Sequence, residues 1–309
     1  MNIFFNENLK LYSDKVTYIF FGLLIIFVII LGVILNYGST FEEQNVNWKQ
    51  DLTDYNLNLK SQLKQNFITK DTYEKETKLI DYRIKNNIAP SSNSDVWSFV
   101  KDVSGKLSIV TIFSIIVAAN IINREFKYGT IKNLLTSPIS KKQIFLTKYL
   151  TVLLFAITMY ILMFLISYIV GGILFGFTSD IPKFLFIKDM KVQENSMIYV
   201  AFVHYFVNLI SLIVMTTISF MCAIIFKNGG LAISVTTVLL LTGTLIETFT
   251  NGIPLARINL FSNLYMDKIY FGELTPIPSM SWALTIILAY FVVFIVLSWI
   301  FFTRRTKEI

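Results

Sequence analysis

Charged side chains are scarce in this 309-residue chain, where Asp, Glu, Lys and Arg together make up 15%. Soluble domains carry about 25%. Hydrophobic residues make up 54%, and the mean hydropathy is +0.61. A water-soluble fold of this size could not bury so much apolar surface. The composition therefore argues against soluble enzymes, nucleic-acid binders and secreted disulfide-rich domains.

Residues that carry catalytic or metal chemistry are equally few. Cys222 is the single cysteine, so no intramolecular disulfide can form, and His204 is the single histidine. We find no paired carboxylates, no nucleophile triad and no Cys/His cluster, which argues against an intramembrane hydrolase. We predict no catalytic residues and no metal site. A phosphate-binding G-x-x-x-x-G-K-[ST] sequence is also absent, so this chain should not hydrolyse ATP alone.

Six apolar runs are each long enough to cross a bilayer, which takes about 20 residues. We place them near residues 16–36, 107–123, 150–177, 199–226, 231–249 and 282–303. The second run is short, and residues 96–100 could extend it. The first run is longer than the hydrophobic part of a signal peptide and has no A-x-A-like cleavage site after it. The predicted fold is an all-α polytopic membrane protein with a six-span domain over residues 16–309.

The basic residues indicate how the spans are oriented. The segment 124–148 has six basic residues and one acid, and the tail after residue 303 is also basic. Six spans place this segment and both termini on one side, which the positive-inside rule assigns to the cytoplasm. We attribute the net charge of +7 to these loops and to anionic membrane lipids, with no nucleic-acid partner. Residues 1–15 are loosely amphipathic and predict an interfacial N-terminal helix.

Two polar regions interrupt the spans on the predicted outer side. Residues 37–106 predict a helical hairpin that breaks near residues 67–71 and ends at Pro90, before a serine-rich return. Helical spacing predicts an apolar stripe on one face of the first helix, formed by Trp48, Leu52, Tyr55, Leu59 and Leu63. A weaker apolar stripe on the second helix is formed by Tyr73, Ile80, Ile84 and Ile88. The hairpin is either an extracellular cap or a gating or partner-binding element. Residues 251–281 contain Pro254, Pro276 and Pro278 and predict short re-entrant or interfacial helices.

The segment after the second span has the clearest local signals. Gly129 allows a turn, and Thr130 is a candidate helix cap. Ile131, Leu134 and Leu135 follow at i, i+3 and i+4, which predicts a short helix with one apolar face. Pro138 should end this helix. Such a helix at the membrane surface could bind a groove on a soluble partner.

The pattern Glu-x-x-x-Gly-Thr-x-x-x-Leu-Leu-x-x-Pro-x-Ser-Lys, from Glu125 to Lys141, resembles the cytoplasmic segment of ABC-2-type transporter permeases. Six spans, cytoplasmic termini and a broken segment before the last span also match that family. The resemblance implies that Thr130–Ser137 is a coupling helix, which docks on a separate ATPase subunit. Glu125 and Gly129 would position it at the end of the second span.

The resemblance also implies an assembly. Two ATPase subunits would bind ATP and Mg, and a second permease, identical or related, would complete the translocation path. This chain itself would hold no cofactor. Relatives of this kind export amphipathic or antimicrobial peptides such as bacitracin-like compounds and lantibiotics, or other drugs. The resemblance and the short, Lys- and Asn-rich loops imply a bacterial cell membrane.

Two ionisable residues inside the apolar runs are candidate contacts of the substrate path. His204 is either a packed polar residue or a substrate contact, and Glu247 either attracts a cationic substrate or extends to the outer surface. A different class of function also fits the pattern. A membrane sensor or assembly module would bind a ligand with the outer hairpin and recruit a signalling protein with the inner helix.

Overall fold

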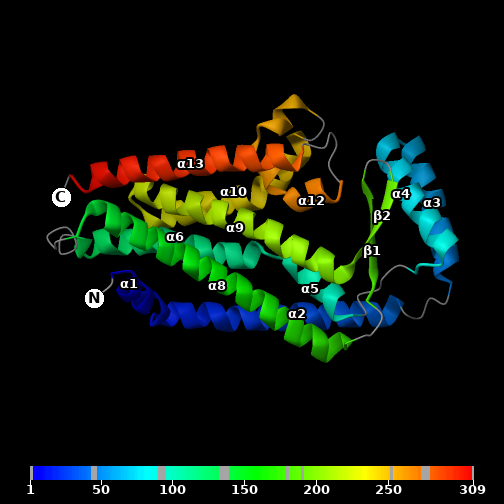
Figure 1. The fold of residues 1–309 in the computed structure, drawn as a ribbon, viewed down its shortest axis with the longest axis horizontal. Helices are drawn as coiled ribbons and strands as arrows, with labels where there is room; N and C mark the ends of the chain where they lie inside the picture. Colours follow the sequence, from blue (N-terminus) through cyan, green and yellow to red (C-terminus); the bar gives the residue numbers. More distant parts are fainter. Residues whose placement is uncertain are drawn as a thin grey trace.

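Six long helices form the body of the protein in a computed structural model (Figure 1), which describes residues 3–42, 47–89, 95–131, 139–177, 181–188, 191–250, 253–272 and 279–307. They are α2 (Lys15–Glu42), α6 (Ser108–Lys127), α8 (Lys141–Phe175), α9 (Met197–Phe226), α10 (Gly229–Thr250) and α13 (Met280–Arg305). Each is long and apolar enough to cross a membrane. The prediction of an all-α polytopic membrane protein is confirmed.

Some helix boundaries differ from the hydropathy pattern. α8 begins at Lys141 rather than near residue 150, because Ser140 and Gln143 form a capping box at its start. α6 continues to Lys127 rather than ending at residue 123. The addition to α6 is mostly charged and the addition to α8 contains three lysines, so a hydropathy count leaves both out although the helices continue through them.

The bundle has an enclosed centre and an apolar exterior. α9 is the most enclosed of the long helices and packs against α6, α10 and α13. Phe155 and Phe220, in the centre of the bundle, are fully buried. α2, α10 and α13 instead expose many large apolar side chains. Such exposure fits a protein whose outer surface contacts lipid.

The two ends of the bundle differ in structure (Figure 1). α1 (Ile3–Tyr12) and the last turn of α13 lie at one end, which we name the termini end. The opposite end, which we name the hairpin end, carries α3 (Trp48–Lys64) and α4 (Lys70–Asn86). α3 and α4 pack against each other as the predicted helical hairpin.

The hairpin stripes are partly as predicted. Leu59 and Ile80 are buried at the contact of α3 with α4, whereas Tyr55 is 46% exposed. Tyr55 was wrongly placed on the packed stripe, because a two-helix hairpin covers a narrower face than the spacing allows. Pro90 lies outside the described residues.

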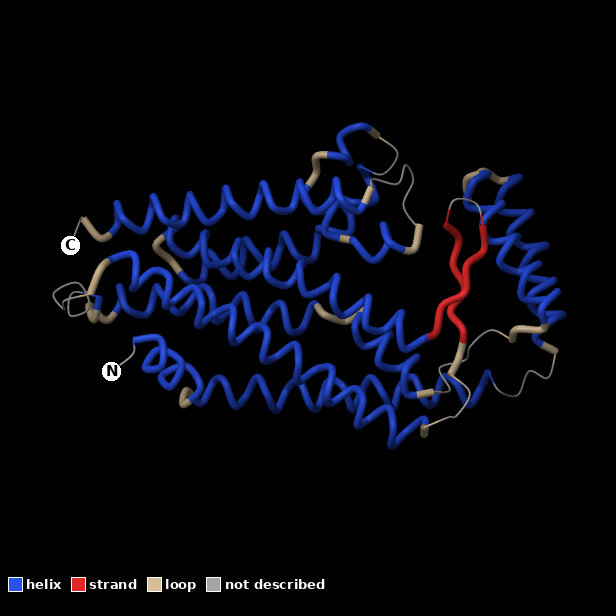
Figure 2. Tube along the Cα trace, in the orientation of Figure 1, coloured by secondary structure: helices blue, strands red, loops and turns tan. Residues whose placement is uncertain are grey.

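A β-hairpin that the sequence analysis did not predict stands beside α4. Strands β1 (Lys183–Lys188) and β2 (Lys191–Ser196) pair antiparallel within the loop between α8 and α9, shown in red in Figure 2. Phe186 on β1 packs edge-on against Phe271. Gly272 has φ +73°, and a Cβ there would lie 2.4 Å from the Ile187 carbonyl oxygen. Only glycine fits this contact between β1 and the segment before α13.

The broken segment before the last span contains short helices, as predicted. They are η1 (Pro254–Arg257), α11 (Leu260–Leu264) and α12 (Met266–Tyr270). Pro276 and Pro278 lie outside the described residues.

A short helix, α5 (Val96–Ser104), precedes α6 and is buried against α8 and α9. Asp95 caps it by accepting hydrogen bonds from the backbone amides of Trp97 and Ser98. Residues 105–107 form a turn that interrupts the helix before α6 begins. α5 is therefore a separate helix and not a continuous extension of the second span. Gly105 and Lys106 in this break are exposed.

Candidate functional site

The carboxylate of Glu125 is the centre of a polar cluster at the termini end of the bundle. Glu125 lies in the last turns of α6, and its side chain is only 4% exposed. Its Oε1 pairs with the ammonium groups of Lys10 on α1 and Lys148 on α8. Its Oε2 accepts a hydrogen bond from the Thr130 hydroxyl. Both oxygens therefore have partners, as a buried charge requires.

Lys148 connects this carboxylate to a second one. Its side chain is 1% exposed, and its Nζ lies 2.9 Å from Glu7 Oε2 and 3.4 Å from Glu125 Oε1. Glu7, Lys10, Glu125 and Lys148 thus form a four-residue group with no net charge, which we name the inner charge cluster. It joins α1, α6 and α8, so these helices meet at one electrostatic contact.

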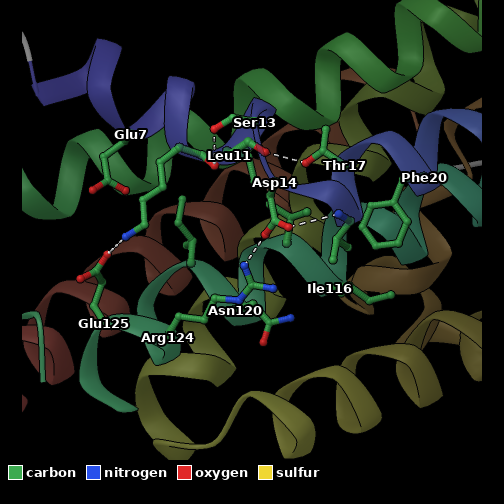
Figure 3. A pocket seen from close by; sticks show the side chains of 14 residues that line it. Glu7, Leu11, Ser13, Asp14, Thr17, Phe20, Ile116, Asn120, Arg124 and Glu125 are labelled. Atoms are coloured by element: carbon green, nitrogen blue, oxygen red, sulfur yellow. Dashed lines mark hydrogen bonds and ion pairs between the residues drawn. The ribbon is translucent and has the colours of Figure 1, made fainter. Parts of the chain in front are cut away.

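A second ion pair fixes the turn between α1 and α2. Asp14 accepts a hydrogen bond from the Arg124 guanidinium on α6 and another from the Val16 amide. The Arg124 contact holds the pKa of the Asp14 carboxyl below its ordinary value, so it is ionised at neutral pH. Figure 3 shows Asp14 and Arg124 pointing toward each other, with Glu125 and Glu7 nearby. These residues line a cavity of about 240 Å³ between α1, α2 and α6.

The N-terminal helix predicted for residues 1–15 is present as α1, and its position at the membrane interface stays a prediction. α1 packs along α8 and buries Glu7, so part of its polar face points into the protein. Phe5 and Leu9 instead are exposed. One side of α1 thus contacts α8, where the buried carboxylate of Glu7 pairs with Lys148.

The chain leaves α6 through a turn that the sequence predicted. Gly129 has φ +71°, a left-handed conformation that side-chain-bearing residues rarely adopt. The Thr130 hydroxyl donates to the carboxylate of Glu125. We expected Thr130 as a helix cap, but the amides it would cap belong to residues 132 and 133, outside the described residues. Ile131 is buried, whereas Leu134, Leu135 and Pro138 also lie outside the described residues.

The last turn of α13 also contacts the end of α6. Arg305 stacks on Phe126, with its guanidinium carbon 3.5 Å from the ring centroid. It also donates hydrogen bonds to Asn123 Oδ1 at 3.1 Å and to the Ala223 carbonyl at 3.4 Å. α6 is thus held at its termini end by α1, α8 and α13.

At the hairpin end, Glu247 is neutralised by a lysine. Its side chain is 5% exposed on α10, and its Oε2 lies 3.0 Å from the Nζ of Lys268 on α12. Glu247 therefore neither extends to the surface nor presents an unpaired charge. His204 on α9 stacks on Phe271 and lies 3.6 Å from Asp267 Oδ2.

Asp267 also lines a cavity of about 330 Å³ inside the bundle, between the α5–α6 break, α9, α10 and α11. We name it the hydroxyl-lined cavity. Its polar lining includes Ser108, Thr111, Asn208, Ser211, Thr244 and Asp267, and its apolar lining includes Met215, Leu240 and Phe261.

Five of the residues that form these ion pairs and the cavity wall were not predicted as site residues: Glu7, Lys10, Lys148, Asp267 and Lys268. Lys148 carried a usable signal, because it stands among apolar residues two turns after Lys141 and Lys142, where a charged group needs a partner. Asp267 and Lys268 carried no such signal, because two adjacent charged residues in a loop are usually solvent-exposed. No group of three or more potential metal ligands occurs among the described residues.

Comparison with known proteins identifies the family. A family model described as "Protein of unknown function (DUF2705)" matches residues 62–306. The protein YhcI of Bacillus subtilis (strain 168) is 32% identical over 311 aligned positions, which cover 99% of this chain and 98% of YhcI. The membrane protein YdbK of the same organism is 22% identical over 202 positions, covering 63% of this chain and 77% of YdbK. No solved structure matches. This multi-pass membrane protein belongs to the DUF2705 family.

Proposed function

We propose that this protein is the permease subunit of an ATP-driven ABC exporter. It would form the translocation path and couple, through Thr130–Ser137, to a separate ATPase subunit that binds ATP and Mg. The proposal rests on the motif from Glu125 to Lys141 and on one structural observation. That observation is the inner charge cluster, which fixes the end of α6 directly before the segment of interest.

The cluster matters because coupling needs a stiff mechanical connection. A partner that moves a surface segment moves the spans only if the segment is firmly joined to them. Thr130 lies at the start of this segment and hydrogen-bonds to Glu125, which in turn pairs with α1 and α8. A displacement of Thr130 would therefore reach α1, α6 and α8 together.

The proposed assembly contains two ATPase subunits and a second permease, identical or related. Its termini end would face the cytoplasm of a bacterial cell, and α3, α4 and the β-hairpin would face outward. The basic residues of the segment 124–148 and of the C-terminal end support this orientation. The family resemblance suggests amphipathic or antimicrobial peptides, or drugs, as the exported substrates.

The test first asks whether a neighbouring gene encodes a protein with a G-x-x-x-x-G-K-[ST] sequence, and then co-expresses that candidate ATPase with this protein. We expect the two proteins to purify as one complex with ATP hydrolysis that vanishes when the lysine of that sequence is changed. Purification of this protein without any nucleotide-hydrolysing partner would contradict the proposal. A neighbouring sensor kinase that co-purifies would instead favour the sensor function.

A further inference from the structure

The lining of the hydroxyl-lined cavity includes the carboxylate of Asp267, which has no close counter-ion among the described residues. Asp267 Oδ2 lies 3.6 Å from His204 Nδ1, which is beyond an ordinary hydrogen bond. Asp267 Oδ1 is inaccessible and has no hydrogen-bond partner among the described residues. The side chain as a whole is 21% exposed. A cation in the cavity can neutralise this carboxylate from its accessible side, while Oδ1 itself stays out of reach.

Nearby lysines are already paired with other carboxylates. Lys268 Nζ lies 3.0 Å from Glu247, and Lys101 Nζ lies 3.1 Å from Asp102. Neither pair leaves a cation for Asp267. The negative charge at the cavity wall is therefore available to a cation that enters from outside the chain.

The other polar groups of the cavity present acceptors. Ser211 donates its hydroxyl proton to the Leu264 carbonyl at 2.7 Å, and Thr111 donates to the Leu107 carbonyl at 3.1 Å. Asn208 donates its amide to the Ser104 carbonyl at 3.4 Å. The hydroxyl protons of Ser211 and Thr111 are thus used, so both oxygens offer lone pairs to a ligand, and Asn208 offers its Oδ1 together with its second N–H. A ligand rich in hydrogen-bond donors matches such a lining.

The place of the cavity also fits a binding site. It adjoins the break between α5 and α6, where Gly105 and Ser108 line it and are exposed. The cavity can therefore be reached from outside the chain. Its volume of about 330 Å³ is at the lower end of the range for small-molecule sites.

From these observations we infer that the hydroxyl-lined cavity binds the ammonium group of a cationic amphiphile, with Asp267 as its counter-ion. A primary ammonium supplies a positive charge and three donors, whereas Met215, Leu240 and Phe261 contact the apolar part. The inference deepens the proposed export function, on which its biological meaning rests. The substrate would be a cationic peptide or drug with a lysine-like amine.

The test measures binding to the purified chain alone in phosphatidylcholine nanodiscs. The probe is dansylcadaverine, which carries a primary ammonium and an environment-sensitive aromatic group. Its neutral match is the N-(5-hydroxypentyl) dansylamide, and empty nanodiscs give the lipid background. We expect the wild-type protein to bind the ammonium probe about tenfold tighter than the hydroxyl probe.

Asp267→Asn should remove this preference while binding of the hydroxyl probe stays unchanged. The matched control is Asp81→Asn on α4, which removes the same charge from an exposed position outside the cavity lining and should preserve the preference. Equal binding of both probes to the wild type, or an unchanged preference in Asp267→Asn, would overturn the inference.

A second variant covers the case in which Asp267→Asn does not fold. Thr111→Leu adds volume at the buried wall of the cavity and leaves Asp267 in place. We expect it to weaken binding of both probes, and wild-type affinity would overturn the inference. Because no ATPase is present, failure here is distinct from failure of the proposed coupling function.

Discussion

Glu125 and Lys148 form an ion pair, with 3.4 Å between Glu125 Oε1 and Lys148 Nζ, and both side chains are almost fully removed from solvent. They stand on α6 and α8, on either side of the segment that resembles a coupling helix. Lys148 also pairs with Glu7, so the contact extends to α1. The two ends of that segment are thus joined to each other and to the N-terminal helix.

Removing the charge of Lys148 should destabilise the protein strongly. Lys148→Met keeps the apolar stem but leaves Glu7 without its ion-pair partner and Glu125 with Lys10 alone. We expect a loss of about 3 kcal/mol, the usual cost of breaking a buried ion pair. Thermal unfolding of the detergent-solubilised protein would show this as a lower midpoint. Lys142→Met, on an exposed position of the same helix, should leave the midpoint nearly unchanged.

A double variant tests whether the cost comes from the unpaired carboxylate. Combining Lys148→Met with Glu7→Gln removes both charges of the 2.9 Å pair. We expect the double variant to be more stable than the sum of the two single losses predicts, by about 1 kcal/mol or more. Strict additivity of the two losses would show that Glu7 and Lys148 do not interact.

Gly129→Ala should disturb the turn after α6 through backbone strain alone. A Cβ at this position meets no atom within 4 Å, but the φ of +71° is unfavourable for alanine. The expected cost is about 1 kcal/mol. Gly22→Ala is the matched control, because Gly22 also has open space around it but lies within α2. Gly22→Ala should leave the unfolding midpoint unchanged or raise it slightly. Equal unfolding midpoints for Gly129→Ala and Gly22→Ala would contradict the turn assigned to Gly129.

The orientation of the bundle can be tested with single cysteines. In a Cys222→Ser background, we place one cysteine at the exposed Leu57 on α3 and another at the exposed Lys307 after α13. A membrane-impermeant maleimide added to intact cells should label position 57 and label position 307 only after lysis. Labelling of position 307 in intact cells would reverse the proposed orientation.

The sequence predicted the long helices well because crossing a bilayer imposes a simple requirement. An apolar run of about 20 residues has few alternatives to a helix in lipid, so α9 and α13 follow directly from their composition. The α3–α4 hairpin also followed, since its periodicity and its break were both local. The extension of α8 back to Lys141 depends on a polar cap, which hydropathy does not detect.

The candidate sites were predicted only in part, because their pairings join distant positions. Glu125 was identified from its motif, but nothing local indicates that Glu7 and Lys148 approach it. Glu247 was identified as a carboxylate in an apolar run, but its neutralisation by Lys268 depends on how α12 packs. We expected Glu247 to attract a cationic substrate, and we now assign this role to Asp267 because Glu247 is already paired. The β1–β2 hairpin was missed because its strands are short and their residues mix polar with apolar types.

The most direct test of the account replaces Leu134 and Leu135 together with aspartate. We co-purify the wild type and the double variant with the candidate ATPase in detergent. The control carries Leu57→Asp and Tyr55→Asp on the exposed face of α3, which adds the same charge at the hairpin end. Unfolding midpoints confirm that both variants are folded.

The account predicts that the wild type and the control form a complex that hydrolyses ATP, and that the double variant loses the ATPase while remaining folded. Two charges in the apolar face of the segment would each cost binding free energy in a partner groove. An intact complex with the double variant, or no ATPase bound to the wild type, would contradict the coupling function.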